Sequence, residues 1–332
     1  MSDLRVGVAG AGFIATAHVH AYAATPGVRV VAIADPVVAK AQALASEVGA
    51  AAVADVDDLL GADLDIVSVC TPSPTHAALA VRALEAGLHV LCEKPIARTL
   101  DDAHRIVAAG SAAPGVLMIG HVSRFEPDHR QAKDIVAAGH LGEIAMMSHS
   151  MTTSLPGWSE GGWFADPDQS GGPLVDLAVH SFDFLSWIAG SDPVRLHAVG
   201  ADSAVGPNTY ALVTVRYASG AIALVETSWA HPASHGFKLS TEIVGTGGRL
   251  HWTYDDIAGG ELFLAGGASM RFDPLSDRGF HAEVRSFVSA VRSGGPSPVP
   301  ATAGFTALRT ALAAIESMAT GTVVDMTEWG VR

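Results

Sequence analysis

The chain has 332 residues, of which 49% are hydrophobic and 16% are charged, a composition typical of a globular protein with about two domains. Its formal net charge of −14 argues against a nucleic-acid partner, because phosphate binding needs a basic surface and the sequence contains no Lys/Arg cluster. The one long uncharged stretch, 106–123, is interrupted by Gly and Pro, and the N-terminus lacks a signal-peptide pattern, so we expect a cytoplasmic protein without membrane contact.

The first third of the chain alternates between strand-like and helix-like runs. Ala-rich helical stretches separate the apolar or β-rich runs, which cover 4–9, 28–34, 66–70, 88–92 and 116–119. Continuous apolar strands separated by helices predict a parallel sheet covered on both faces. We therefore expect a doubly wound α/β domain over residues 1–122.

A glycine-rich segment, GAGFIA, begins at Gly10 directly after the first predicted strand. It matches the dinucleotide-binding pattern G-x-G-x-x-G/A, in which Gly10 allows a tight turn and Gly12 lets the backbone approach a pyrophosphate. Phe13 and Ile14 then open a helix whose N–H groups favour an anion. Asp35 ends the second strand, where a carboxylate binds a ribose 2′-hydroxyl and repels a 2′-phosphate, so NAD is expected rather than NADP. The alternative is a simple glycine turn, with Asp35 capping the next helix.

Two polar segments follow neighbouring predicted strands. Thr71-Pro72 comes after the strand at 66–70, and Glu93-Lys94-Pro95 comes after the strand at 88–92. Ligands of parallel α/β sheets bind at the carboxyl ends of the strands, so both segments lie on the expected cofactor side. Position alone leaves Lys94 as either an exposed surface charge or a group directed at a ligand.

The pattern changes after about residue 122, where strands follow one another with turns between them. These runs cover 143–151, 195–200, 211–217, 221–229 and 238–244. The succession predicts a second, α+β domain over residues 123–332 with a large, mainly antiparallel open sheet. Helical stretches at 281–292 and 304–319 close the chain, and we expect them to pack back on the first domain.

Residues 171–190 predict one buried helix, because nearly every face of it is apolar. Asp176, His180 and Asp183 stand at i, i+4 and i+7, so they are expected to form one polar row on that helix. Buried polar groups need partners, which are either one another in a core network or a polar ligand. A histidine oriented by a carboxylate is also what a general base requires.

Taken together, these motifs resemble the Gfo/Idh/MocA oxidoreductases, the family of glucose–fructose oxidoreductase and inositol dehydrogenase. The resemblance rests on GAGFIA, Asp35, CTPSPTH at 70–76, EKP at 93–95, GHVSRFEP at 120–127 and GGPLVDLAVH at 171–180. It implies an N-terminal Rossmann domain and a C-terminal domain whose open sheet mediates homodimers or homotetramers. It also implies hydride transfer between nicotinamide and a secondary hydroxyl of a sugar or cyclic polyol.

The resemblance further implies roles for individual residues. His180 would take the hydroxyl proton, Lys94 would stabilise the developing alkoxide, and Asp176 would orient His180 or hold a substrate hydroxyl. A cis Lys94–Pro95 peptide bond is expected, since proline makes the cis form accessible. Beside the glycine turn, the predicted cofactor-binding residues are Thr71, Pro72, His76, Glu93 and Lys94.

Further residues are candidates for the substrate pocket, since aromatic faces and polar tips suit a sugar; ordinary packing is the alternative reading. They are His121, Arg124, Trp158 and Trp163. We expect no metal, because the remaining histidines lack ligand spacing. His231 and His235 are four residues apart, but Pro232 and Gly236 argue against a helix that would align them.

Two other functions stay open on the sequence alone. The first is glycoside hydrolysis through transient oxidation by a retained NAD, which occurs on the same fold. The second is a non-catalytic dinucleotide sensor that binds protein partners, although the presence of Lys94, Asp176 and His180 together speaks against it. The identity of the sugar or polyol depends on loops whose conformation the sequence does not define.

Overall fold

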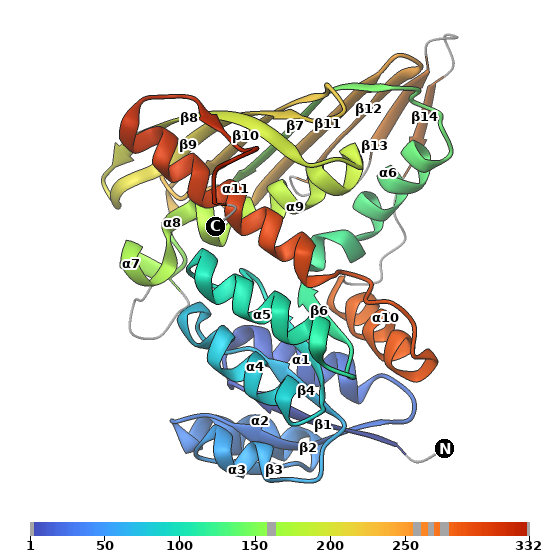
Figure 1. Cartoon of the computed structure of the whole chain (residues 1–332), viewed down its shortest axis with the longest axis vertical. Helices are drawn as coiled ribbons and strands as arrows, with labels where there is room; N and C mark the ends of the chain where they lie inside the picture. The colour runs from blue at the N-terminus through green and yellow to red at the C-terminus, as the bar shows by residue number, and fades with distance from the viewer. Residues whose placement is uncertain (1–2, 158–163, 255–259, 265–268, 273–278, 331–332) are drawn as a thin grey trace. The chain divides into compact units, whose positions relative to one another are not determined.

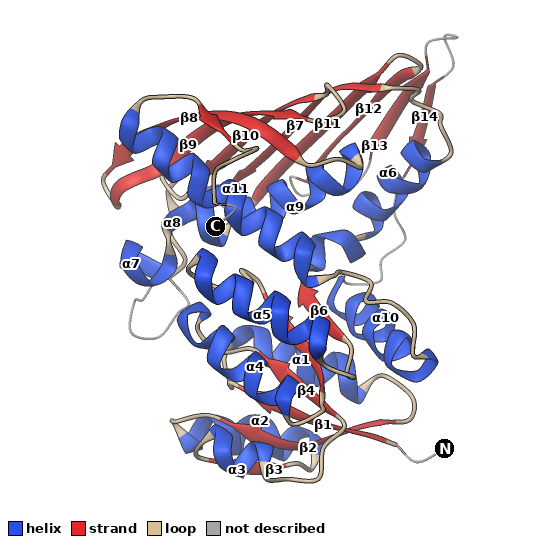
Figure 2. Cartoon of the chain, viewed as in Figure 1, coloured by secondary structure: helices blue, strands red, loops and turns tan. Residues whose placement is uncertain are grey.

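The computed structural model describes residues 3–157, 164–254, 260–264, 269–272 and 279–330 (Figure 1). The chain divides into two units, each built around one sheet, whose strands and helices Figure 2 distinguishes. The first unit comprises Met1–Phe125 and Asp277–Phe305, and the second comprises Glu126–Ser276 and Thr306–Arg332. Within the described ranges, no helix combines the length and the apolar character needed to cross a membrane.

The first unit contains a six-stranded parallel sheet in the order β3-β2-β1-β4-β5-β6. Its strands are β1 (Leu4–Ala9), β2 (Val28–Ala34), β3 (Ala51–Val53), β4 (Ile66–Val69), β5 (His89–Glu93) and β6 (Leu117–Gly120). Every residue of β4 and β6 is buried, as expected for strands covered on both faces. The predicted doubly wound domain is therefore confirmed, with the strand order of a Rossmann fold.

The helices of the first unit include one from far along the chain. They are α1 (Phe13–Ala23), α2 (Val38–Val48), α3 (Val56–Leu60), α4 (His76–Glu85), α5 (Leu100–Ala112) and α10 (Gly279–Ser293), with short 3₁₀ turns η1 (Ser73–Thr75) and η2 (Val122–Phe125). Helix α10 packs against α1. At its end, the Arg292 guanidinium donates hydrogen bonds to the carbonyls of Pro26 (2.6 Å) and Gly27 (2.9 Å).

The second unit contains a nine-stranded sheet in the order β14-β13-β12-β11-β7-β10-β9-β8-β15. Its strands are β7 (Ile144–Thr152), β8 (Pro193–Ser203), β9 (Gly206–Tyr217), β10 (Ile222–Ser228), β11 (Lys238–Gly245), β12 (Gly248–Tyr254), β13 (Gly260–Leu264), β14 (Ser269–Phe272) and β15 (Val324–Asp325). Strands β7 and β10 pair in parallel, and the other pairs are antiparallel. The expected mainly antiparallel open sheet is confirmed.

One face of this sheet is covered by helices (Figures 1 and 2). The elements of the second unit are α6 (Pro127–Ala137), α7 (Pro167–Ser170), α8 (Gly172–Asp176), α9 (Ala178–Ala189), the 3₁₀ turn η4 (Ala233–His235) and most of α11 (Ala301–Thr320). Helix α8 contacts β9 and β10, and α9 contacts β10 and β7. Along β9, Val213 and Val215 are buried, whereas the alternating residues Thr214 and Arg216 are exposed. This alternation is what an antiparallel strand with one covered face requires.

The expectation of a single helix over 171–190 is wrong. The helix is interrupted at Leu177, where α8 ends and α9 begins. The amide of His180 donates to the Leu177 carbonyl three residues back (3.2 Å) instead of four, so the regular hydrogen-bond ladder is broken there. Asp176 and His180 therefore lie on different helical segments, and of the three residues of the predicted polar row only Asp183 is fully buried.

A buried histidine pair lies beneath the sheet of the second unit. His149 on β7 is 2% exposed, with its Nδ1 2.8 Å from the Ser181 hydroxyl and its Nε2 3.4 Å from Nε2 of His129. His129 in turn contacts the Asp128 carboxylate through Nδ1 (2.9 Å). Burial, and secondarily the neighbouring His129, lowers the pKa of His149 from 6.5 to about 3, while Asp128 acts in the opposite direction.

We expect this pair to make the second unit sensitive to acid. The unfolded chain binds a proton at His149 near pH 6.5, whereas the folded chain does so only near pH 3, so stability is lost as the pH falls through this window. At pH 5 the loss is about 2 kcal/mol. His149→Gln, which is neutral, should show a smaller fall in thermal midpoint between pH 7 and pH 5 than wild type. His140→Gln, at an exposed position, is the control, and equal falls in all three proteins would contradict this assignment.

Candidate active site

The glycine turn lies between β1 and α1, where it approaches the neighbouring strand end closely. Gly10 has φ +101°, and a Cβ there would lie 2.5 Å from the Cys70 carbonyl oxygen, so only glycine fits. At Gly12, by contrast, a Cβ would meet nothing within 4 Å. Gly12 caps α1 without a side-chain hydrogen bond, and the first turn contains no acidic residue. The open backbone and the helix N-terminus together suit a pyrophosphate.

Asp35 connects the end of β2 to this turn. Its Oδ2 accepts a hydrogen bond from the amide of Ala11 (2.9 Å), and its Oδ1 accepts one from the amide of Val37 (2.8 Å). The carboxylate thus bonds the glycine turn and the loop before α2, but it does not cap this helix, whose N-cap residue, Val37, has no side-chain hydrogen bond. Because each carboxylate oxygen has two lone pairs, it keeps the capacity to accept a further hydrogen bond from a ribose hydroxyl.

His76 lies beneath the loops that follow β4 and β5. It is 1% exposed, with Nδ1 2.8 Å from the Pro95 carbonyl oxygen and Nε2 2.9 Å from the Thr71 carbonyl oxygen. Burial lowers the pKa of His76, although both carbonyls act in the opposite direction. The imidazole therefore lies between the loop that contains Thr71 and Pro72 and the loop that contains Lys94 and Pro95, and each of its nitrogens faces a backbone carbonyl oxygen.

The Glu93-Lys94-Pro95 segment ends β5 at the same edge of the sheet. Glu93 is buried (5% exposed), Lys94 is half-buried, and the Lys94–Pro95 peptide bond is cis, as the family resemblance implied. The first unit thus brings the glycine turn, Asp35, the loop after β4 and Lys94 to the carboxyl ends of adjacent parallel strands, where doubly wound folds bind ligands.

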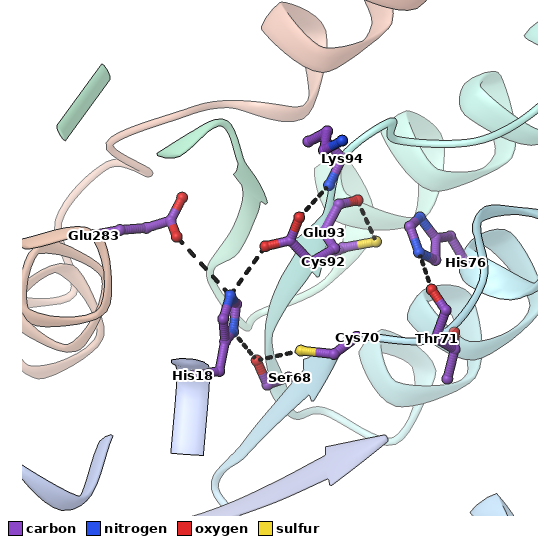
Figure 3. A network of polar contacts seen from close by, with 9 residues as sticks. All are labelled: His18, Ser68, Cys70, Thr71, His76, Cys92, Glu93, Lys94 and Glu283. Atoms are coloured by element: carbon purple, nitrogen blue, oxygen red, sulfur yellow. Dashed lines mark hydrogen bonds and ion pairs between the residues drawn. The ribbon is translucent and has the colours of Figure 1, made fainter. Parts of the chain in front are cut away.

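A buried polar network adjoins this segment and was not predicted from the sequence (Figure 3). His18 of α1 is 0% exposed, with Nδ1 2.8 Å from the Ser68 hydroxyl and Nε2 2.9 Å from Oε1 of Glu93. The other oxygen of Glu93, Oε2, accepts a hydrogen bond from the backbone amide of Lys94 (3.1 Å). On the other side of the ring, a carboxylate oxygen of Glu283 from α10 lies 3.9 Å from Nε2.

The electrostatic interactions of His18 and Glu93 oppose the effect of burial on both side chains. Burial opposes the charged form of His18, but Cys70 and Glu93 raise its pKa well above the usual range. Burial likewise opposes ionisation of Glu93, but His18 and Lys94 lower the pKa of its carboxyl group. Each of the two groups therefore favours the charged form of the other. His18 and Glu93 are 75 residues apart, so sequence spacing gave no signal for this contact.

The same residues are the only described ones in which three metal-ligating atoms lie within 4.8 Å of one another: His18, Glu93 and Glu283. Two ligands of one tetrahedral ion at about 2.0–2.1 Å would lie about 3.3 Å apart. The 2.9 Å between His18 and Glu93 is instead a hydrogen-bond distance. The expectation of no metal remains a prediction.

In the second unit, the catalytic candidates lie around the helix break. Asp176 is the last residue of α8 and His180 is in the first turn of α9, and both are half-buried. Asp183 is 1% exposed, and its charge contributes to raising the pKa of Tyr217 on β9 after the larger effect of burial. It therefore faces the core, whereas Asp176 and His180 retain access to solvent.

The candidate substrate residues have different surroundings. His121 follows β6 and is 1% exposed, and Arg124 in η2 is half-buried, with its amide bonded to the His121 carbonyl (3.0 Å). Trp158 and Trp163 lie outside the described residues.

His231 and His235 come together although, as expected, no α-helix aligns them. The rings of His231 and His235 stack with centroids 4.0 Å apart and an interplanar angle of 14°. The 3₁₀ turn η4, which follows Pro232, brings them together without an α-helix. Nε2 of His235 also lies 3.1 Å from the Thr152 hydroxyl.

The strand order, the glycine turn and the placement of Asp35 define the first unit as a dinucleotide-binding Rossmann fold. Residues 4–121 match the family model of an oxidoreductase family with an NAD-binding Rossmann fold, and residues 129–251 match the Gfo/Idh/MocA C-terminal domain. The chain belongs to the Gfo/Idh/MocA oxidoreductase family, which confirms the resemblance seen in its motifs.

Named relatives extend this comparison. Inositol 2-dehydrogenase of Rhizobium meliloti (strain 1021) is 30% identical over 330 residues, covering 95% of this chain and 97% of that protein. D-Glucoside 3-dehydrogenase of Escherichia coli (strain K12) is 33% identical over 252 residues, covering 69% and 71%. The crystal structure of GenD2 from gentamicin A biosynthesis in complex with NAD has a TM-score of 0.86 at 26% identity, covering 98% and 97%. This chain is therefore an oxidoreductase that uses a nicotinamide cofactor.

Proposed function

We propose that the protein is an NAD-dependent dehydrogenase that transfers a hydride between a secondary hydroxyl of a sugar or cyclic polyol and nicotinamide. The observation that carries this proposal is the position of Lys94 directly after β5. It lies at the carboxyl-terminal edge of the parallel sheet, as do the glycine turn and Asp35. A cation at that edge is suited to stabilise negative charge on a substrate oxygen. The inositol and glucoside dehydrogenases among the relatives support the substrate class.

The residues of the chain fit this cofactor and this chemistry. Gly12 leaves its backbone open, and α1 presents its N-terminus, so a pyrophosphate can be bound there. Bound NAD would supply the hydride acceptor. His180 takes the proton of the substrate hydroxyl, Lys94 stabilises the charge that develops on that oxygen, and Asp176 orients His180 or a neighbouring substrate hydroxyl.

We assign cofactor binding to residues 1–122 and substrate binding to residues 123–332. Thr71 and Pro72, in the loop after β4, and His76, at the start of α4, are proposed to bind the cofactor. His121 and Arg124, on either side of the boundary at residue 122, are proposed to contact the substrate. The outer face of the nine-stranded sheet exposes Ile222 (44%) and Leu224 (45%), which supports a homodimer or homotetramer formed through that face.

Cofactor preference should depend on Asp35. Asp35→Ser removes the carboxylate and keeps a hydroxyl that can accept the Val37 amide, so we expect the ratio of kcat/KM for NAD to that for NADP to fall at least tenfold. Damage to the glycine turn alone would lower both values by the same factor and leave the ratio unchanged. Asp55→Ser removes a comparable carboxylate, which caps α3 by accepting the Asp58 amide (2.9 Å), and is the matched control.

The overall function is tested by following NADH absorbance across a panel of inositols, aldoses and amino sugars. Activity with one class of secondary alcohol supports the proposal and identifies the substrate class. Tight NAD binding without turnover on any member would count against it. In that case, release of the aglycone from aryl glycosides with no net NADH formation would indicate hydrolysis by a retained cofactor, and silence in both assays would favour a dinucleotide sensor.

A further inference from the structure

We propose that His18 and Glu93 are positioning residues for Lys94: His18 holds the Glu93 carboxylate, and Glu93 holds the backbone of Lys94. The inference rests on the function proposed above for Lys94. Neither residue needs to touch substrate or cofactor, so it also revises the role expected for Glu93 as a direct cofactor ligand.

The first argument is that the two carboxylate oxygens of Glu93 contact different partners. Oε1 contacts Nε2 of His18 (2.9 Å), and Oε2 accepts the Lys94 amide (3.1 Å). A Cβ at Gly120 would lie 2.8 Å from Oε1, so the β6 backbone closes the remaining side of the carboxylate. The Glu93 side chain is thus held between α1 and β6, and it in turn holds the backbone nitrogen of Lys94.

The second argument is the direction of the chain. Successive residues in extended backbone direct their side chains to opposite sides, so anchoring Glu93 inward turns Lys94 outward. In Figure 3, the Lys94 side chain lies on the far side of Glu93 from His18. A loosened Glu93 would therefore change the direction of the Lys94 side chain without removing any group from it.

The third argument is energetic. Taking a carboxylate and an imidazolium out of water is costly, and buried ion pairs often give no more stability than apolar residues of similar volume. Here the cluster contains His18 at 0% exposure, Glu93 at 5% and Glu283 at 0%. A gain in fold stability is therefore a poor explanation for this pair, whereas fixing the geometry of a reacting group is a sufficient one.

The pair also connects two parts of the expected active site. His18 lies on α1, the helix that begins at the glycine turn, and Glu93 ends the strand that precedes Lys94. On the ring's other nitrogen, Nδ1 contacts the Ser68 hydroxyl on β4 (2.8 Å), which restricts its rotation. His18 thus links α1 to the residue that precedes Lys94.

The test uses two replacements of His18 that each retain one of its nitrogens. The side-chain amide of Asn reaches the Nδ1 position and loses the contact with Glu93, whereas that of Gln reaches the Nε2 position and keeps it. We expect His18→Asn to lower kcat at least tenfold with the NAD dissociation constant within threefold of wild type. His18→Gln should recover at least a third of the wild-type kcat. His20→Asn, on the same helix at an exposed histidine that contacts Glu47 (2.8 Å), should match wild type.

A second readout does not depend on turnover. The rate at which an amine-reactive ester labels Lys94, measured by mass spectrometry relative to Lys40, should change at least threefold in His18→Asn but not in His18→Gln. If wild type is inactive on every substrate, the proposed function fails, and this labelling rate alone decides the positioning role. Should His18→Asn not fold, Glu93→Gln is used, because one amide group cannot accept both the His18 and the Lys94 donors.

Two outcomes would overturn the inference. In the first, the Asn variant keeps its labelling rate and, where wild type turns over, its kcat. In the second, the Asn and Gln variants lose kcat or change labelling equally, with a matching fall in thermal midpoint, which is the result of a purely structural role.

Discussion

Lys94→Ala is expected to lower kcat by about 100- to 1,000-fold, the loss found when a group that stabilises a developing oxyanion is removed. The physical reason is that alkoxide character grows on the substrate oxygen as the hydride leaves, and the ammonium stabilises this charge more in the transition state than in the bound alcohol. NAD affinity should change less than about threefold, because the pyrophosphate and ribose contacts are expected at the glycine turn and Asp35.

The measurement pairs steady-state kinetics with NAD titration by fluorescence. Arg105→Ala is the matched control, since this cation belongs to the same unit but has a 60% exposed side chain that contacts Asp102 (2.9 Å). Its kcat should equal that of wild type. A Lys94→Ala enzyme with more than a third of wild-type kcat would remove Lys94 from the reaction, and a loss of NAD binding would make it a cofactor ligand instead.

His180→Ala is expected to lower kcat by about 10²- to 10⁴-fold, the usual contribution of a general base. Raising the pH should recover part of this loss, because solvent hydroxide replaces the missing base, whereas Lys94→Ala should show no such recovery. Asp176→Asn should have a smaller effect, since it leaves the imidazole in place at the start of α9.

The pH dependence of kcat across these variants distinguishes a base from a structural group. His140→Ala, at an exposed histidine of the second unit, controls for the loss of an imidazole as such. An equal loss of activity at every pH in His180→Ala, together with a lower thermal midpoint, would assign His180 to packing and not to proton transfer.

Local sequence patterns predicted much of the fold because the determining interactions are local. Continuous apolar runs such as β4 marked the parallel sheet, and the glycine turn with Asp35 marked the dinucleotide site. Short or polar strands were not predicted, among them β3 and β15. The clearest missed signal was β12, where Leu250 and Trp252 are buried on alternate positions in the pattern of a half-covered strand.

The rest depends on contacts between distant segments. At the break, the His180 amide bonds the Leu177 carbonyl three residues back instead of four. The apolar periodicity of the sequence does not reveal this change. The His18–Glu93 pair requires α1 and β5 to be placed side by side, and the stacked rings of His231 and His235 require the turn at η4. Sequence reasoning placed Glu93 among the cofactor-binding residues but gave no signal for its buried contacts with His18 and the Lys94 amide.

The parallel pairing of β7 with β10 has a consequence for how the chain folds. Strands β8, β9 and β10 form one succession of hairpins, and β11 to β14 form another, so both can form from neighbouring segments. Strand β7 joins them, pairing Met146 with Ile222 on one side and Met147 with Ile243 on the other. Both pairings close long loops, whose entropic cost must be met before the contacts form. Refolding of the second unit should therefore be limited by the docking of this one strand between two preformed meanders.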